Sequence, residues 1–190
     1  MTAEIDAVAP PTWVVGTWKI DTVHSHVGFI VKHMMVSKVR GHFSEYNGTI
    51  VTAENPLESS VTTTITAASI DTGNEMRDGH LAAADFFDAE NHPELTFAST
   101  GVRIANDEWR LDGVLTLRGV SKPVTLDMET PEFGPGDSEG AMKAGFSATT
   151  QINRNDFGVN YNGPIPGGGK ALGEKVQIVL DLEADLVLAE

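Results

Sequence analysis

The sequence has 190 residues, and its 27 Asp and Glu outnumber its 13 Lys and Arg, which gives a formal net charge of −14 at pH 7. Nucleic-acid binding depends on a basic surface, so this charge argues against a nucleic-acid partner. The sequence contains no cysteine, which excludes disulfides, zinc–thiolate sites and cysteine nucleophiles. The length fits one domain, and the 41% of hydrophobic residues suffice for a folded core.

Residues 1–12 are predicted to form a flexible N-terminal tail, followed by one domain over residues 13–190. The first ten residues contain no Lys or Arg and no apolar core, so they lack the pattern of a secretory signal. No apolar run approaches the ~18 residues that a membrane span needs. We therefore expect a soluble, cytoplasmic protein without stable membrane insertion.

Apolar and polar residues alternate through most of the remaining chain, as in β-strands with one buried face. The clearest case is the last predicted strand, where every second residue from Val176 to Leu188 is apolar. A helix is predicted only over about residues 74–88, with Asn74 or Thr72 as its cap and Gly79 as a weakening residue. The predicted strands cover residues 13–20, 25–34, 39–53, 59–70, 94–105, 109–118, 124–129, 142–149 and 176–188.

Turn-forming residues separate several of these strands. Residues 118–123 and 133–137 are predicted links, and Asn47-Gly48 and Asn106-Asp107 are predicted bends. Eight or nine antiparallel strands with one short helix favour an all-β, closed barrel, because closure removes exposed strand edges. A barrel of about eight strands is filled by side chains or holds one small ligand. A β-sandwich is the alternative that this pattern leaves open.

No Asp or Glu occurs between Asp21 and Glu45, although acidic residues are frequent elsewhere. On a regular strand His24 and His26 in this segment share a face, as two ligands of a metal would. His33 falls on the opposite face, so no third histidine ligand is evident, and surface or hydrogen-bonded histidines are favoured. A metal-dependent enzyme that uses His24 and His26 with a carboxylate stays an alternative.

His33 shares its strand face with apolar residues. It is either a hydrogen-bonded core histidine or a polar contact inside an apolar cavity, where ligand sites place their few orienting groups. Lys38 and Arg40 follow a short connection. They either flank a cavity mouth and receive a phosphate or carboxylate, or they are solvated turn charges.

Residues 163–170 are rich in glycine and end in Lys170, but they do not match a phosphate-binding loop. That motif needs Gly at position 164 and Ser or Thr at position 171, where this chain has Pro164 and Ala171. A flexible loop is predicted instead. No Gly-x-Ser-x-Gly motif occurs either, so the residues give no sign of nucleophilic catalysis.

Several motifs occur in order along the chain: WKIDTVHS (18–25), VGFIVKHMMVSKVRGHF (27–43), HL with DFFD and PELTF (80–97), LTLRGVSKPV (115–124) and INRNDFG (152–158). Together they resemble the YceI-like family, the lipocalin-like polyisoprenoid-binding proteins, over roughly residues 13 to 188. The resemblance implies an antiparallel barrel closed around an apolar tunnel, with a helix near one end. It also implies a polyisoprenoid or similar long-chain lipid as the ligand, no cofactor or metal, and no enzymatic activity.

The resemblance further implies which residues contact the ligand. The tunnel wall would include Val27, Phe29, Phe43, Phe97, Leu115, Phe146 and Phe157. The head-group region would include His24, His33, Arg40, Asn153 and Arg154. The expected role is that of a lipid carrier, storage or sequestering protein. A filled barrel that serves as an interaction module is a further alternative, and homodimer formation stays open.

Overall fold

The computed structural model describes residues 9–188, and the predicted tail over residues 1–12 falls mainly on residues 1–8, outside the described range. Within residues 9–188 the chain forms eleven strands, one α-helix and three short 3-10 helices. The strands are β1 (Gly16–His33), β2 (Ser37–Phe43), β3 (Tyr46–Thr52), β4 (Ser60–Thr66), β5 (Ile70–Asp71), β6 (Glu94–Ala105), β7 (Glu108–Leu117), β8 (Val120–Met128), β9 (Glu132–Pro135), β10 (Met142–Asn153) and β11 (Leu172–Leu186). The helices are η1 (Pro56–Glu58), η2 (Ala67–Ser69), α1 (Glu75–Ala82) and η3 (Arg154–Phe157).

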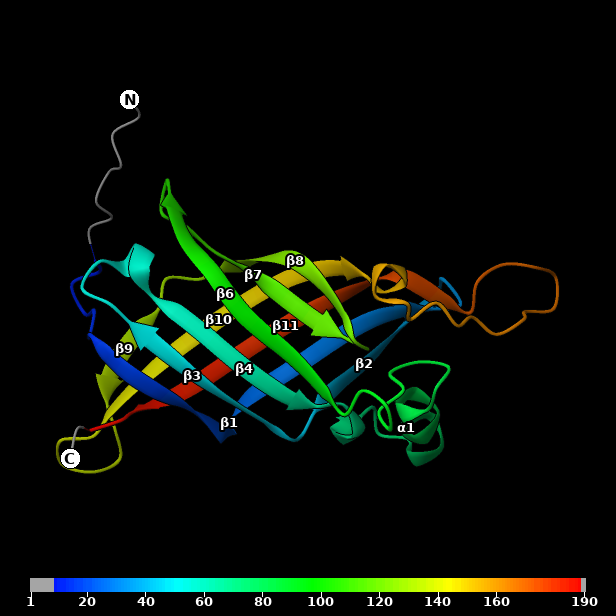
Figure 1. Ribbon diagram of the computed structural model, residues 1–190, viewed down its shortest axis with the longest axis horizontal. Coiled ribbons are helices and arrows are strands. Elements are labelled where there is room, and N and C mark those ends of the chain that lie inside the picture. The colour runs from blue at the N-terminus through cyan, green and yellow to red at the C-terminus, as the bar shows by residue number, and fades with distance from the viewer. Residues whose placement is uncertain (1–8, 189–190) are drawn as a thin grey trace.

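Eight of these strands form a closed antiparallel barrel, in the order β1, β3, β4, β6, β7, β8, β10 and β11, and the pairing of β11 with β1 closes the ring (Figure 1). The predicted all-β barrel with one short helix is therefore confirmed. The strand β2 extends the wall beside the C-terminal half of β1, where β3 no longer pairs. The helix α1 lies near the end opposite both chain termini (Figure 1).

The strand β1 contains a large bulge that the alternation pattern did not predict. Asp21 pairs with Glu183 and His26 pairs with Asp181, so five steps along β1 face two steps along β11. Residues 22–25 are therefore outside the regular ladder, and the strand bends sharply. The two strands predicted over 13–20 and 25–34 are in fact one bent strand.

The bulge also changes which residues of β1 point inward. Before it, Trp18 is buried and Ile20 lines the interior, so even-numbered residues face the core. After it, Val27 and Phe29 line the interior, so odd-numbered residues do. An odd number of extra residues has this effect because strand side chains alternate with a period of two.

Tight turns join several neighbouring strands. Asn106 and Asp107, between β6 and β7, both have positive φ (52° and 61°), as the predicted bend requires. The link predicted over residues 118–123 is shorter than expected, because Arg118 and Gly119 alone connect β7 to β8. The link predicted over residues 133–137 is partly strand β9, and the strand predicted over 39–53 divides into β2 and β3. Asn47-Gly48 lies within β3.

The helix α1 begins as predicted but ends earlier. The Asn74 side chain accepts a hydrogen bond from the backbone N–H of Arg77 and caps the first turn. The helix ends at Ala82, and residues 83–88 form turns. Phe86 is buried and Phe87 lines the barrel interior, so the packing of these two rings favours turns over a continued helix.

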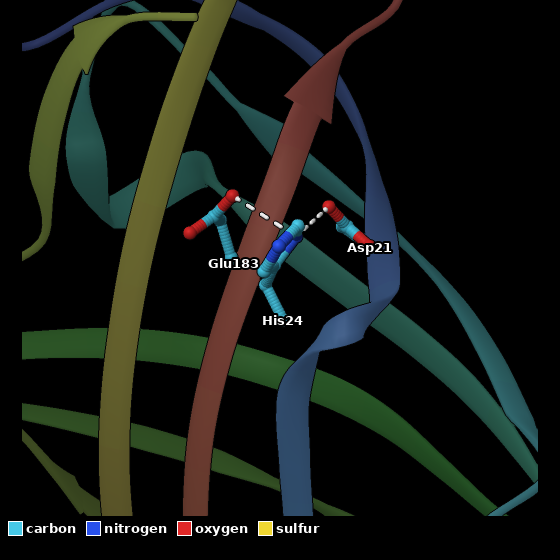
Figure 2. A group of neighbouring side chains, drawn as sticks. All are labelled: Asp21, His24 and Glu183. Atoms are coloured by element: carbon cyan, nitrogen blue, oxygen red, sulfur yellow. Dashed lines mark hydrogen bonds and ion pairs between the residues drawn. The ribbon is translucent and has the colours of Figure 1, made fainter. Parts of the chain in front are cut away.

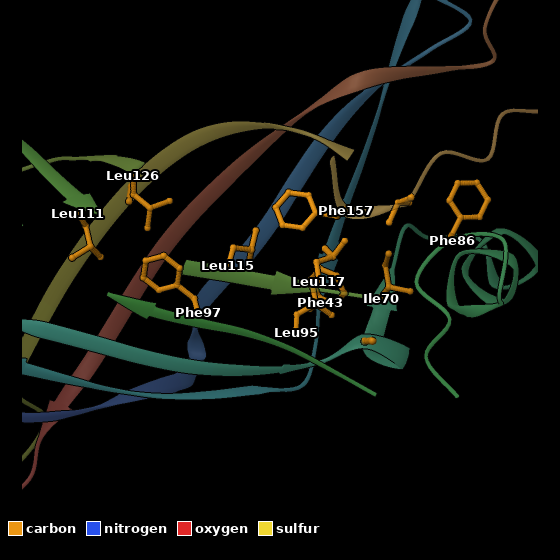
Figure 3. Close-up of a cluster of buried hydrophobic side chains, with 13 residues drawn as sticks. Phe43, Ile70, Phe86, Leu95, Phe97, Leu111, Leu115, Leu117, Leu126 and Phe157 are labelled. Carbon is orange, nitrogen blue, oxygen red and sulfur yellow. The ribbon is translucent and has the colours of Figure 1, made fainter. Parts of the chain in front are cut away.

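The core has a large cluster inside the barrel (Figure 3) and a smaller one around Trp18. The Trp18 indole N–H donates to Thr52 Oγ1 over 2.8 Å, and this hydroxyl donates to Val14 O over 2.6 Å. Both side chains, those of Trp18 and Thr52, are fully buried.

Among residues 9–188, no helix has the length and hydrophobicity that a membrane crossing requires.

Replacing Thr52 with Val is expected to lower the free energy of unfolding by about 1–3 kcal/mol, because the buried indole N–H loses its acceptor. Urea denaturation followed by Trp fluorescence measures this effect. Thr116→Val is the matched control, since the Thr116 hydroxyl bonds Ser121 at the exposed surface. Equal losses in the two variants would contradict the assigned role of the buried bond.

Candidate functional site

The barrel encloses an apolar cavity of about 490 Å³, which is within the range of roughly 300–1,000 Å³ typical of ligand sites. Inward-facing residues of neighbouring strands form its wall. On β11 these are Val176, Ile178, Leu180 and Leu182, the alternating residues that the sequence marks as one face. We call this space the barrel cavity.

Packed aromatic rings cover the end of the barrel cavity that lies near the chain termini. Trp13 stacks on Trp109 with ring centroids 5.7 Å apart, and Phe133 contacts Trp13 edge-on at 5.2 Å. The Trp13 indole N–H donates to Ala53 O over 2.9 Å, which fixes the ring at this end of the cavity. We call this the aromatic end.

Polar side chains gather at the other end of the barrel cavity, beside α1. The Arg and His residues of the lining, together with Tyr161, lie here: His33, Arg77, His80, Arg154 and Tyr161. His80 and Tyr161 contact each other edge-on at 5.1 Å, and His80 also hydrogen-bonds Asp85 over 2.9 Å. We call this the polar end. The barrel cavity is therefore asymmetric, with apolar walls, an aromatic end and a polar end.

Arg154 is 6% exposed and holds the polar end together. Its guanidinium donates to the carbonyl oxygens of Val159 (2.7 Å), Tyr161 (2.9 Å) and Gly173 (2.9 Å). Burial lowers the pKa of this guanidinium, but Arg stays charged at neutral pH. Arg154 therefore ties the start of the 158–171 loop to the beginning of β11.

A second polar cluster lies outside the barrel cavity, at the β1 bulge (Figure 2). His24 Nδ1 is 2.8 Å from Asp21 Oδ2 and 3.8 Å from Glu183 Oε1. These three residues have the ligand atoms that a metal ion needs, all within 4.8 Å of one another. The Lys143 ammonium, however, bonds Asp21 over 2.9 Å and both Glu183 and Asp185 over 2.8 Å. A side-chain cation thus already lies among these carboxylates and offsets part of their negative charge.

The same contacts shift the ionisation of the cluster. Hydrogen bonds from His24 and Lys143 hold the pKa of the Asp21 carboxyl well below its ordinary value. Asp21 in turn raises the pKa of the exposed His24 above 6.5. Because His24 gains this partner on folding, its contribution to stability is present below pH 6.5 and is lost as the pH rises through the folded-state pKa.

We expect Asp21→Asn to lower the pKa of His24 towards 6.5, because the imidazolium loses its hydrogen-bonded carboxylate. An NMR titration of the His24 ring measures this shift. Asp185→Asn is the matched control, since Asp185 bonds Lys143 but not His24. A His24 pKa that is unchanged in Asp21→Asn would refute this account of the cluster.

Comparison with known proteins assigns the chain to a family. The model of the YceI-like domain matches residues 18–184. The chain belongs to the YceI-like family. Protein YceI of Escherichia coli O157:H7 is 36% identical over 175 residues, which cover 90% of this chain and 87% of that protein.

Solved structures agree with this membership. The crystal structure of the Campylobacter jejuni YceI protein has a TM-score of 0.68 at 32% identity and covers 88% of this chain and 96% of that one. A polyisoprenoid-binding domain from Saccharophagus degradans has a TM-score of 0.63 at 14% identity, covering 92% of this chain and all of that one. At this low identity, the second likeness shows a shared fold alone.

In this YceI-like barrel, most of the predicted tunnel residues lie together. Those that line the barrel cavity are Val27, Phe29, Phe43, Phe97, Leu115 and Phe146. Phe157 does not line it: its side chain, 2% exposed, packs in the large core cluster beside β8 and β10. Phe157 is therefore corrected from a wall residue to a packing residue of η3.

Of the predicted head-group residues, His33 and Arg154 lie at the polar end and three do not. His24 lies in the bulge and bonds Asp21 on the outer surface. Arg40 is exposed on the outward face of β2, opposite Ile30. Asn153 caps η3 by accepting from the Asn155 N–H over 3.0 Å. These three residues do not line the barrel cavity, because the position of a residue in a motif does not specify which face of a strand is inward.

His24 is an exposed, hydrogen-bonded histidine, the arrangement that the sequence favoured, and the bulge separates it from His26. His26 packs against His42, with ring centroids 5.6 Å apart, and it is not part of the Asp21 cluster. The sequence reasoning missed Arg77 and Tyr161 at the polar end. They lie on α1 and on the 158–171 loop, and only the tertiary fold brings these segments together.

Proposed function

We propose that this YceI-like protein binds a long-chain isoprenoid or a related lipid in the barrel cavity, as a carrier, storage or sequestering protein. The observation that carries the proposal is the mainly apolar lining of the 490 Å³ cavity. The same fold occurs in the Saccharophagus degradans domain that is described as polyisoprenoid binding. A cavity of this volume also favours a lipid site over a barrel filled with side chains.

The two ends of the barrel cavity suit the two parts of such a ligand. Hydrocarbon would lie along the wall with its tail against Trp13 and Trp109. Burial of each methylene contributes about 0.8 kcal/mol, so a chain of modest length is enough for tight binding. A polar head group would lie near His33, Arg77 and His80, whose nitrogens offer hydrogen bonds. The proposed role is binding, and no catalytic step is part of it.

Native mass spectrometry of gently purified protein, followed by solvent extraction and lipid identification, tests the proposal. We expect a bound species with a mass that matches a prenyl or similar long-chain lipid. Titration of lipid-free protein with a fluorescent farnesyl or geranylgeranyl probe is the independent measurement. If no lipid co-purifies and no prenyl probe binds, the proposed function is refuted.

A further inference from the structure

The hairpin tip between β1 and β2 exposes three consecutive apolar side chains, Met34, Met35 and Val36, the last of them 88% exposed. Met34 and Met35 have positive φ, 51° and 60°. Asn106 and Asp107 adopt the same backbone in the β6–β7 turn, and Asn and Asp tolerate this conformation much better than other residues with a Cβ atom. Turn geometry therefore does not account for two methionines at this tip.

Basic residues flank the hairpin tip on its outward face. Lys32 lies directly opposite Lys38, and Arg40 follows on the same face. Like charges in opposed positions destabilise a strand pair. None of the three forms an ion pair with any of residues 9–188. The chain thus keeps an unneutralised positive strip on a protein of net charge −14.

This hairpin lies at the polar end of the barrel cavity. The Met34 N–H donates to Ala171 O over 2.8 Å, which links the tip to the 158–171 loop, and His33 and Ala171 line the cavity. Figure 1 shows the hairpin, that loop and α1 at the end opposite both termini. Exposed apolar side chains continue around this end, with Met76 on α1 and Tyr161 on the loop.

We propose that the polar end docks on an anionic lipid bilayer through the β1–β2 hairpin, with Met34, Met35 and Val36 entering the interface and Lys32, Lys38 and Arg40 contacting the head groups. This proposal rests on the proposed function, since it states how a lipid enters the barrel cavity. Apolar residues flanked by basic ones are the combination that binds at a bilayer surface. Flexible methionines without a defined groove fit fluid lipid better than a rigid protein partner.

The remaining charges determine the orientation of docking. Glu75 and Asp78 lie on α1, so that side of the polar end is less suited to an anionic surface. On β11, Glu174 is paired with Lys170. The large negative charge elsewhere repels other faces of the protein from the bilayer. Contact through the hairpin would let a prenyl chain pass into the cavity without crossing water.

Co-sedimentation with vesicles tests the docking surface. The probes are vesicles of phosphatidylcholine alone and of equimolar phosphatidylcholine and phosphatidylglycerol. We expect the protein to bind the second kind, and Lys38→Glu to reduce binding by roughly tenfold or more. The substitution places a carboxylate opposite Lys32, so it should not weaken the fold. Lys19→Glu is the control for net charge, since Lys19 is exposed on the part of β1 that pairs with the end of β11. Circular dichroism checks its fold, because the new carboxylate faces Asp185.

The apolar tip is tested by Met34→Asn with Met35→Gly, which removes both thioethers and favours the same turn. We expect this double variant also to lose most vesicle binding while its circular dichroism stays unchanged. Equal binding of the wild-type protein to both kinds of vesicle would overturn the proposal. So would equal losses in Lys19→Glu and Lys38→Glu.

A soluble farnesyl probe added without vesicles separates docking from lipid binding. If the protein takes up this probe but binds no vesicles, docking is refuted and the proposed function stands. If vesicles bind through the hairpin but no probe enters, the proposed function fails and the docking surface stands. Uptake of the probe should be equal in the wild-type protein, Lys38→Glu and Lys19→Glu.

Discussion

Replacing Arg154 with Met is expected to lower the free energy of unfolding by about 3–5 kcal/mol. The substitution removes the donors to three carbonyl oxygens, those of Val159, Tyr161 and Gly173, while keeping an apolar side chain of similar length. Each buried carbonyl without a donor costs about 1–3 kcal/mol, and this cost is smaller where water can reach the oxygen. Urea denaturation measures the loss. Hydrogen exchange should show the largest loss of protection at the start of β11.

Two variants make the Arg154 experiment specific. Arg154→Lys keeps the charge but cannot donate in three directions with a rigid fork, so we expect an intermediate loss of about 1–3 kcal/mol. Arg110→Met is the surface control, because Arg110 pairs with Glu108 and Asp127 in exposed positions and should cost at most about 1 kcal/mol. If Arg154→Met is no more destabilised than Arg110→Met, Arg154 does not hold the loop.

Much of the fold could be predicted because the alternation of apolar residues is a local signal. β11 follows its predicted faces from Val176 to Leu186, and Asn74 caps α1 as expected. The β1 bulge was missed although the sequence contains a sign of it. Apolar residues lie at even positions up to Ile20 and at odd positions from Val27, and a regular strand cannot bury both sets on one side.

The site was less predictable because it depends on contacts between distant segments. A motif identifies Arg154 as a residue of interest, but only the structure shows that its donors are used by backbone carbonyls 5 to 19 residues away. Arg77 reaches the polar end because α1 contacts β5, which pairs with the end of β2. No local pattern encodes that arrangement. Conversely, the acid-free segment between Asp21 and Glu45 was visible from the start, and its basic residues lie outward instead of inside the barrel cavity.

Thr63→Trp is expected to weaken binding of a long prenyl probe by about 100-fold. Thr63 lies on β4 and lines the barrel cavity, with Gly48 and Phe97 as its register partners on the two neighbouring strands. An indole at position 63 would therefore project into the cavity and occupy the volume of three or four methylenes. Loss of about 0.8 kcal/mol for each displaced methylene gives roughly 2.5–3 kcal/mol, which corresponds to the stated factor.

Thr62→Trp provides the matched control, because Thr62 is the preceding residue of the same strand and is exposed on its outer face. The two variants carry the same substitution. A difference in probe affinity between them therefore depends on whether the indole lies inside or outside the barrel wall, not on the indole itself. Fluorescence titration with geranylgeranyl and shorter farnesyl probes measures both affinities. The shorter probe should lose less affinity in Thr63→Trp, because it can bind on one side of the indole. If the two variants bind the long probe equally and Thr63→Trp unfolds at the wild-type urea concentration, the ligand does not pass through the middle of the barrel cavity.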